Sequence, residues 1–481
     1  MAQSDMPGEI SLPAASAPAA VPTSAEADRV VARLERLPFL SLHFRVASIL
    51  GTGMVFDAFD TLVISVAVVT IATTFQLNAA STGILLSSGF AGQLLGAIIC
   101  GYVSEIYGRK MTFVYGLALF GLFSLLSAFA WNLGSLLILR MVVGLGIGGI
   151  PPVATALFSE YLPGRSRGTG GMVFGILFAV GYLVASPLAI LSSSLFSANV
   201  SWRALFVFGA IPLVLALFAY LRLPESVRWL LSKHRTEEAE RIVTQIEAQA
   251  EGKGKHLKDL DTLPAYHADV QRTRFGELFS PHYYRRTVLT WVQWFTAYFV
   301  LGGFASWLPT MFVNLGGLSR NVAYSLIFVT GLCELALIVI AALTWDRVGR
   351  RPWFIGGYAV SAISAVIGIF AITSLHASIA LVLATAGLLV LLGVYISVGG
   401  VYLYASELYP TRMRSWGTST GRAISAIGNI LGPLIVGAML TARLGLSAIF
   451  VLFGAVALVG LAAMLALGVE TKRKVLEEIA A

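Results

Sequence analysis

Apolar stretches about as long as a membrane is thick recur along the chain, separated by short polar segments. Four of them, at residues 111–131, 170–193, 353–373 and 379–400, contain no Asp, Glu, Lys or Arg. A helix needs about 20 apolar residues to cross a bilayer, whereas the strands of a membrane barrel are about ten residues long and alternate. Because lipid admits only helices and closed barrels, the pattern predicts an all-α integral membrane protein.

The same pattern predicts about twelve transmembrane helices, arranged as two six-helix halves. They lie near residues 46–75, 82–104, 111–131, 134–159, 169–193, 203–222, 285–313, 322–344, 353–373, 379–405, 416–441 and 446–469. We expect a disordered cytoplasmic N-terminus (1–40), a first half (41–222), a cytoplasmic central loop (223–284), a second half (285–469) and a cytoplasmic tail (470–481). Within the central loop, residues 236–250 have the pattern of an amphipathic, solvent-facing helix.

Composition agrees with a membrane protein and adds its orientation. The sequence is 57% hydrophobic and 12% charged, whereas soluble domains carry about 25% charged residues. Lys and Arg are concentrated on one set of loops, and such loops face the cytoplasm. We therefore expect both termini in the cytoplasm and a multi-pass protein of the plasma membrane, the inner membrane of a bacterium. This bias accounts for the net charge of +8, so the charge implies no nucleic-acid partner.

Two short motifs occur twice, in the same order. "GYVSEIYGRK" at 101–110 corresponds to "ALTWDRVGRR" at 342–351, and "SEYLPGRSRG" at 159–168 corresponds to "SELYPTRMRSWG" at 406–417. The offsets agree, because Asp346 follows Glu105 by 241 residues and Glu407 follows Glu160 by 247. Two features repeated at nearly the same offset indicate two homologous halves.

This organisation and the loop motif resemble the major facilitator superfamily. The resemblance covers nearly the whole chain after residue 40, and it implies two rigid halves that rock about a central substrate site. It also implies a gate at the cytoplasmic mouth, in which Glu105 and Arg109 pair with neighbouring charges and Gly101 lets a helix of the other half approach closely. We expect the gating residues to be Glu105, Arg109, Glu160, Arg165, Arg167, Asp346, Arg350, Glu407 and Arg414. Ordinary cytoplasmic positive charge would explain the arginines, but not the repeated acid–x–x–Gly–Arg spacing.

Five ionisable residues fall deep inside predicted spans: Asp57, Asp60, Arg140, Glu334 and Arg422. A charge at the bilayer centre costs roughly 2.5–3.5 kcal/mol on insertion scales, so such residues are functional candidates. Asp57 and Asp60 are three residues apart and therefore share one helix face, which we expect to turn toward a cavity. Neighbouring buried carboxyls disfavour one another's ionisation, so this pair is predicted to bind and release a proton.

The two buried arginines need anionic partners. Arg140 could pair with Asp57 or Asp60, whereas Arg422 has no acid nearby in the sequence and suits a substrate carboxylate through its planar guanidinium. The alternative is structural, with these charges pinning helices together. For Glu334, packing and gating are both open. No histidine lies deep in a span, so a histidine proton carrier is not expected.

The residues around these charges narrow the resemblance. "FDAFDTLVIS" (56–65) is similar to helix 1, and "TRMRSWGTSTGRAISAIGNILGPLIVG" (411–437) to helix 11, of the aromatic acid:proton symporters and the related nicotinate transporters. The resemblance implies that Asp57 and Asp60 serve proton coupling, while Arg422, with Arg140, meets a substrate carboxylate. "PESVRWLLSKHRTEEA" (224–239) instead resembles an element of sugar porters.

Polar and aromatic residues on two further helices complete the predicted substrate site. Gln293 and Tyr298 lie on the seventh predicted span and Tyr402 on the tenth. An aromatic lining would stack against an aromatic ring. Packing against lipid or other helices is the alternative for each of these side chains.

One motif is misleading. "GLGIGG" at 144–149 fits the dinucleotide-binding pattern G-x-G-x-x-G, which needs a strand before it and a helix after it. Here it lies inside a predicted membrane helix, so we interpret its glycines as a surface for close helix packing.

The sequence thus predicts a secondary transporter rather than an enzyme. We expect proton-coupled uptake of a small aromatic monocarboxylate such as nicotinate, benzoate or a hydroxybenzoate, by a monomer driven by the proton gradient. Cys100 and Cys333 both lie within predicted spans, so neither a metal nor another cofactor is expected. The alternatives are a sugar or polyol porter and, less favoured by its helix 5, a drug antiporter. A non-transporting receptor or a membrane enzyme would be a different class, and proton-dependent uptake separates a carrier from both.

Overall fold

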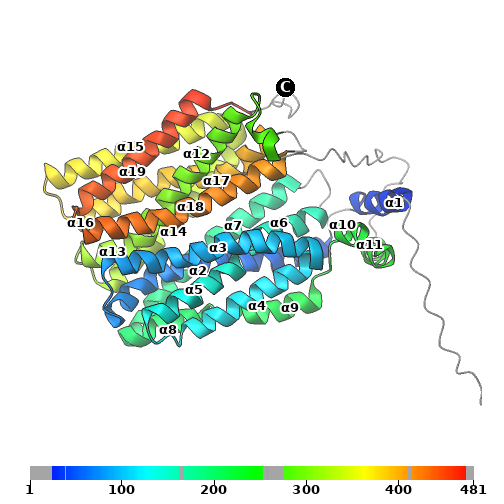
Figure 1. Ribbon diagram of the computed structural model, residues 1–481, viewed down its shortest axis with the longest axis horizontal. Coiled ribbons are helices and arrows are strands. Elements are labelled where there is room, and N and C mark those ends of the chain that lie inside the picture. Colours follow the sequence, from blue (N-terminus) through cyan, green and yellow to red (C-terminus); the bar gives the residue numbers. More distant parts are fainter. Residues whose placement is uncertain are drawn as a thin grey trace, which may run out of the picture.

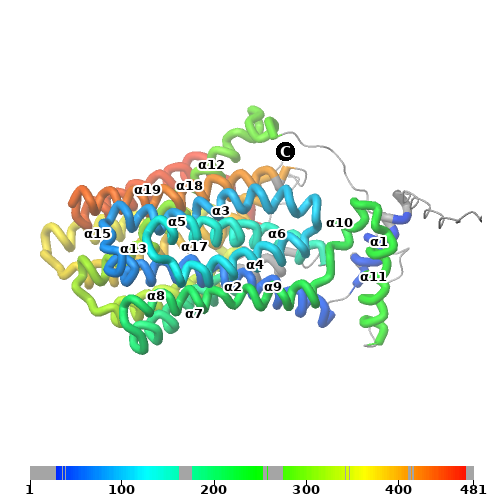
Figure 2. Tube along the Cα trace, turned by 60° about the horizontal axis from the view of Figure 1, so that its bottom comes forward, coloured from blue at the N-terminus to red at the C-terminus, as the bar shows by residue number. Residues whose placement is uncertain are grey.

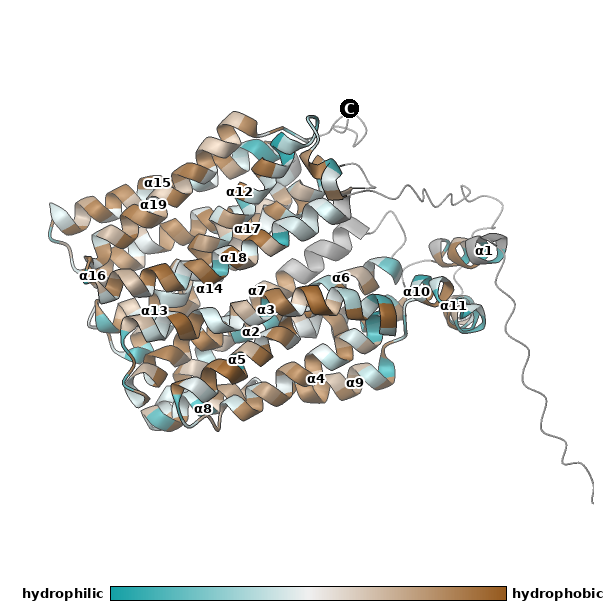
Figure 3. Ribbon diagram, in the orientation of Figure 1, coloured by the Kyte–Doolittle hydropathy of each residue, from teal (hydrophilic) through white to brown (hydrophobic). Residues whose placement is uncertain are grey.

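The computed structural model describes residues 24–37, 40–161, 167–252, 257, 275–409 and 413–472. In these residues, twelve helices are long and apolar enough to cross a membrane, and the secondary structure is entirely helical. The predicted all-α fold with two six-helix halves is confirmed (Figure 1). Hydrophobic residues run along the bundle helices, and hydrophilic residues gather at helix ends and on the central loop (Figure 3).

The first half contains six membrane spans. They are α2 (Ser41–Thr74), α3 (Ala79–Tyr107), α4 (Arg109–Ser127), α5 with α6 (Leu133–Gly148 and Ile150–Tyr161), α7 (Arg167–Leu195), and α8 with α9 (Ala198–Phe208 and Ile211–Arg222). The central loop forms α10 (Val227–Ser232) and α11 (Thr236–Glu251), followed by the short helix η3 (Phe275–Phe279).

The second half repeats this plan. Its first two spans are α12, η4 and α13 (Tyr284–Val300, Leu301–Ala305 and Ser306–Asn314), and α14 (Arg320–Val348). The others are α15 (Arg350–Thr373), then α16, η5 and α17 (Ile379–Val382, Leu383–Gly387 and Leu388–Leu408), α18 (Arg414–Thr441) and α19 (Gly445–Leu467). Glu334 and Arg422, two of the buried charges found in the sequence, therefore lie on α14 and α18.

Glycines let the helix backbones approach closely inside each half. A Cβ atom on Gly144 of α5 would lie 2.0 Å from the carbonyl oxygen of Gly89 on α3, closer than any side chain tolerates. A Cβ on Gly357 of α15 would likewise lie 2.5 Å from the carbonyl oxygen of Gly393 on α17. The "GLGIGG" segment is thus a helix-packing surface, as interpreted from the sequence, because small residues at an interface allow backbone contact in membranes.

The two halves meet through α3 with α18, α7 with α14 and α2 with α13. We call the end of the bundle that carries Gly108 and Gly349 the motif end. Polar contacts between the halves lie toward the other end, where the Tyr324 hydroxyl donates to the Val66 carbonyl at 3.0 Å and Ser193 hydrogen-bonds Asn321 at 2.5 Å. Among the described residues, the ion pairs of the motif end each join elements of one half.

A small helical cap lies beyond the motif end (Figure 2). Its first member, α1 (Ser24–Glu35), falls within the segment 1–40 that we expected to be disordered. That prediction is wrong for residues 24–35, because the apolar side chains of Val30 and Leu34 are buried in one cluster with those of α11. Residues 1–23 lie outside the described part of the chain.

One acid on α11 holds α1 in place. Glu247 is buried and accepts hydrogen bonds from Arg33 at 2.5 Å and from Arg36 at 2.6 Å. Burial alone would raise the pKa of Glu247, but the hydrogen bonds from the two arginines outweigh it and hold the pKa below the usual range. The ion pairs therefore persist at neutral pH.

The Glu247→Gln variant is expected to weaken the docking of α1 by about 1–2 kcal/mol. Amide hydrogen exchange in residues 24–35 should accelerate accordingly. Because the pKa of Glu247 is lowered in the folded protein, the native contribution is complete above about pH 4.3 and declines as the pH falls below it. Glu251→Gln, at the exposed end of α11, is the matched control. Equal exchange in both variants would contradict this role.

Candidate transport site

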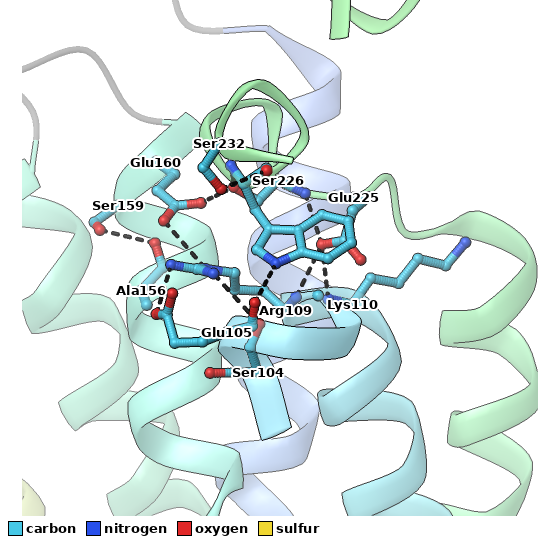
Figure 4. Close-up of polar contacts among 12 residues, drawn as sticks. Ser104, Glu105, Arg109, Lys110, Ala156, Ser159, Glu160, Glu225, Ser226 and Ser232 are labelled. Carbon is cyan, nitrogen blue, oxygen red and sulfur yellow. Dashed lines mark hydrogen bonds and ion pairs between the residues drawn. The ribbon is translucent and has the colours of Figure 1, made fainter. Parts of the chain in front are cut away.

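The first loop motif is built around the start of α4. Gly108, with φ of +99°, turns the chain from α3 into α4. Glu225 accepts hydrogen bonds from the backbone N–H groups of Arg109 and Lys110, both at 3.0 Å (Figure 4). A carboxylate here satisfies free N–H groups and complements the positive end of the helix dipole. A Cβ on Gly108 would lie 2.2 Å from Glu225 Oε2, so the motif requires glycine.

The side chain of Arg109 joins α3 to α6. Its guanidinium lies 3.1 Å from the carboxylate of Glu105 and 3.4 Å from that of Glu160 (Figure 4). The side chain of Glu105 is 68% exposed and that of Glu160 only 15%, so the Glu160 pair contributes more. The Ser226 hydroxyl also donates to Glu160, and the Trp229 indole donates to the Glu105 carbonyl at 3.1 Å. These contacts fasten α3, α6 and α10 together within the first half.

The second half repeats the arrangement. Gly349 has φ of +104°, and Glu470 accepts from the backbone N–H groups of Arg350 at 3.0 Å and Arg351 at 3.1 Å. The guanidinium of Arg350 lies 2.8 Å from Glu407. The repeat predicted from the sequence thus recurs as a repeated contact network.

Glu225 and Glu470 were not among the predicted site residues. Both stand directly after the last span of their half, in "LPES" (223–226) and "GVET" (468–471), and this shared position was a usable signal. Their partners are 116 and 120 residues away in the sequence, so the contact itself appears only in the folded chain.

Five predicted gating residues are placed by the structure: Glu105, Arg109, Glu160, Arg350 and Glu407. Arg165 lies outside the described residues, as do the side chains of Arg167, Asp346 and Arg414. Because the ion pairs observed join elements of one half, their direct effect is to hold each half rigid, and their action as a gate remains a prediction. The close approach expected at Gly101 is wrong for this conformation, since a Cβ there would have nothing within 4 Å.

The deepest ion pair joins α2 to α5. The guanidinium of Arg140 contacts the carboxylate of Asp60, and both residues are almost fully buried, at 1% and 4% exposure. Arg140 also lies 5.1 Å from the ring centre of Phe206, and its Nε and Nη1 atoms have no hydrogen-bond partner in the described residues. A small cavity lined by Thr61 and Gln93 opens beside the pair. Of the two acids open to Arg140 in the sequence, the structure selects Asp60.

The second arginine within a membrane span, Arg422, is half-buried and lies near the other aspartate. Arg422, on α18, lies close enough to Asp57, on α2, for their charges to interact across the two halves. Its guanidinium lies 5.7 Å from the ring centre of Tyr298. Trp294 stacks on Tyr298 at 5.5 Å, and Tyr402 meets Trp294 edge-on at 4.4 Å. The structure thus gathers Tyr298, Tyr402 and Arg422 in one place and adds Trp294, which was not predicted as a site residue.

Gln293 is not part of this group. It is fully buried, and its amide donates to the carbonyl of Gly460 on α19 at 3.0 Å. Gln293 therefore makes a packing contact inside the second half instead of the predicted substrate contact. Consecutive residues of a helix point in different directions, so Trp294 joins the aromatic cluster while Gln293 points toward α19.

Glu334 lies in a separate cavity between the halves. The cavity is lined by Leu62 and Tyr182 of the first half and by Leu308, Glu334 and Tyr395 of the second. Glu334 is 4% exposed, and its Oε2 atom has no hydrogen-bond partner in the described residues. It is therefore the buried carboxyl whose role the packing leaves unexplained.

The twelve membrane helices found in the described residues, arranged in two repeated halves with ionisable residues buried in the bundle, have the architecture of a major facilitator superfamily transporter. The chain belongs to the sugar (and other) transporter family, whose model matches residues 46–481.

Two curated relatives and one solved structure show where the chain stands within this family. It is similar to the niacin transporter NiaP of Acinetobacter baylyi, with 32% identity over 94% of this chain and 99% of the relative. It is also similar to the 4-hydroxybenzoate transporter PcaK of the same organism, with 29% identity over 79% of this chain and 81% of the relative. The crystal structure of a D-xylose-proton symporter shares the fold, with a TM-score of 0.72 and 20% identity over 90% of this chain and 99% of that chain.

The variants Gly108→Ala and Gly101→Ala separate the two glycines of the loop motif. At position 108 alanine would have to keep the positive φ of the turn, and its methyl group would meet Glu225, so we expect a loss of about 1–3 kcal/mol in unfolding free energy and a lower Tm. At Gly101 the methyl group enters open space within a helix, and alanine should be neutral or slightly stabilising. Thermal unfolding of the purified protein measures both. Equal Tm values would show that Gly108 is not constrained as described.

Proposed function

We propose that the protein imports a small aromatic monocarboxylate together with a proton, by alternating access. The observation that carries this proposal is the place of Arg422, which lies beside an aromatic cluster in one half and close enough to Asp57 of the other half for their charges to interact. A guanidinium binds a carboxylate through two parallel hydrogen bonds, and Tyr298 and Trp294 offer faces on which an aromatic ring can stack. The names of the two relatives, a niacin and a 4-hydroxybenzoate transporter, support the same substrate class.

The proposed coupling follows from the cost of an unpaired buried charge. When a substrate carboxylate occupies Arg422, Asp57 loses its cationic partner. An isolated carboxylate in this environment costs several kcal/mol, and a proton removes that cost. Anion and proton therefore enter together, so that the loaded chamber carries less charge while the halves reorient.

The ion pair of Asp60 with Arg140 is proposed as the proton-sensitive partner of this site. Asp60 lies one turn from Asp57 on α2, and protonation of Asp60 would release Arg140. Arg140 then has all its nitrogen atoms free for the substrate anion or for a new contact during reorientation. The two aspartates thereby connect substrate binding on α18 to the packing of α2 against α5.

The motif end is proposed to face the cytoplasm, because positive charge gathers there. The described contacts between the halves lie toward the other end, which suits a conformation that is closed to the outside. We further propose that the protein acts as a monomer in the bacterial inner membrane, with both termini cytoplasmic.

A sugar or polyol remains the second candidate substrate, since the matching family model is named for sugar transporters. Competition uptake in proteoliposomes, with aromatic acids against neutral sugars at two external pH values, tests the two directly. Inhibition by aromatic acids alone, stronger at acidic external pH, supports the proposal. Inhibition by sugars alone would overturn it.

Asp60→Asn is expected to abolish accumulation driven by a pH gradient. One pH unit stores about 1.4 kcal/mol per proton, enough for about tenfold accumulation. The variant should fall to a ratio of about one, while exchange of labelled for unlabelled substrate continues, because exchange needs no net proton movement. Tenfold accumulation by the variant would remove Asp60 from the coupling step.

Arg422→Lys is expected to raise the KM for an aromatic acid about tenfold. Lysine keeps the charge but loses the planar fork that holds two carboxylate oxygens. Arg443→Lys, at an exposed position outside the bundle core, is the matched control. Initial uptake rates over a range of substrate concentrations give the KM of each variant. An unchanged KM for Arg422→Lys would assign this arginine to structure alone.

A further inference from the structure

Glu334 is the buried acid that the proposed function does not use. It projects from α14 into the cavity between the halves, with Tyr182 of α7 and Tyr395 of α17 beside it. An acid that only pinned helices together would be expected to have a cationic or hydrogen-bond donor for each oxygen, because breaking such a pair is costly. Instead Oε2 has no partner within the described residues. A buried polar atom without a partner, beside a cavity, is suited to bind a group from outside the protein.

Tyrosines extend from the cavity toward the arginine site, beginning with Tyr182 in the cavity lining. Tyr182 is close enough to interact electrostatically with both Glu334 and Asp57. Tyr298, which lies beside Arg422, interacts in the same way with Tyr182. The interior therefore has a cationic pole at Arg422, an acidic pole at Glu334, and aromatic side chains between them.

These two poles match a bipolar ligand. We propose that Glu334 binds the polar ring substituent of the substrate, while Arg422 binds its carboxylate; this inference rests on the proposed function. A carboxyl group accepts a hydrogen bond when ionised and can also donate one when protonated. Glu334 can therefore meet either a ring hydroxyl or a ring nitrogen, and it has nothing to bind on an unsubstituted ring. The protein should prefer hydroxylated or nitrogen-containing aromatic acids to plain benzoate.

The preference has a second physical source. Plain benzoate would leave the Glu334 carboxyl buried and unpaired in the loaded state, and a site with an unsatisfied polar group rejects the ligand that fails to satisfy it. Discrimination thus comes from the cost of the unpaired carboxyl with benzoate as well as from the hydrogen bond made with the polar acids.

The test compares three probes in proteoliposomes that contain the full-length protein: benzoate, 4-hydroxybenzoate and nicotinate. The native protein should show a KM at least about tenfold lower for the two polar acids than for benzoate, as one good buried hydrogen bond allows. Glu334→Met, of similar length and apolar, should remove this difference by raising the KM of the polar acids about tenfold. The KM of benzoate should not rise, and it should fall to the extent that the unpaired carboxyl disfavours benzoate in the native protein.

Two further variants keep the result interpretable. Glu334→Gln retains hydrogen-bonding capacity and should preserve most of the preference. Ser361→Ala removes another buried polar group of the second half. The Ser361 hydroxyl donates to the Val390 carbonyl at 2.8 Å and does not line the cavity, so this variant should change no KM. The Tm of each variant reports whether it is folded.

The possible results separate this inference from the proposed function. If the native protein transports all three acids with equal KM, the proposed function stands and the role of Glu334 as a ligand-binding residue is overturned. An equal rise in the KM of all three acids in a folded Glu334→Met variant also overturns this role. The same holds if Glu334→Met loses pH-driven accumulation but keeps the native preference among the acids. If the native protein transports none of the three, the proposed function fails first, and the inference fails with it.

Discussion

The cost of charge in hydrocarbon is the constraint on which the interior of this protein depends. Asp60 and Arg140 lie where burying an isolated ion would cost several kcal/mol. Each charge is tolerated because the other contacts it. Asp57 and Arg422 lie on different halves and are close enough for their charges to interact, with Tyr298 beside the guanidinium. An attraction between charges on two bodies ties the relative position of those bodies to the charge state of the two groups. For a transporter this is a direct way to connect binding with movement.

Rigidity of each half is supplied by a different interaction. Glycines on α3 and α5, such as Gly89 and Gly144, allow backbone contact that leaves no room for a side chain. In membranes such contact substitutes for the hydrophobic effect, which cannot drive helices together in lipid. Because each half is packed in this way, we expect any displacement of the halves to be concentrated at the seams between α3 and α18 and between α7 and α14.

The motif end adds a second, duplicated fastening. In each half a glycine with positive φ turns one helix into the next, and a glutamate from beyond the sixth span caps the new helix. The carboxylate is held by two N–H groups and the dipole, so the cap works without any contact to the other half. The duplication explains why charges are repeated in the sequence at a nearly constant offset. The arginines of the motif also form ion pairs within their own half, a role that positive charge on a loop would not by itself require.

The class of fold, the number of spans, the two-half repeat and the identity of the charges inside the bundle could all be read from the sequence. Each of these follows from local rules, because the length of an apolar run and the presence of Asp57 or Arg422 inside it can be read without knowing any neighbour. Which partner each charge takes depends instead on how the helices pack against one another. Arg140 had two candidate acids one turn apart, and helix rotation placed Asp60 against it and Asp57 toward Arg422. The orientation of α12 turned the Gln293 amide toward the Gly460 carbonyl of α19. Folding of the whole chain brought Glu225 and Glu470 to helix ends more than 100 residues away and packed α1 against α11. Contacts of that kind depend on how the helices are rotated and stacked. Sequence periodicity identifies the polar face of a helix, but not which residue of a neighbouring helix will contact that face.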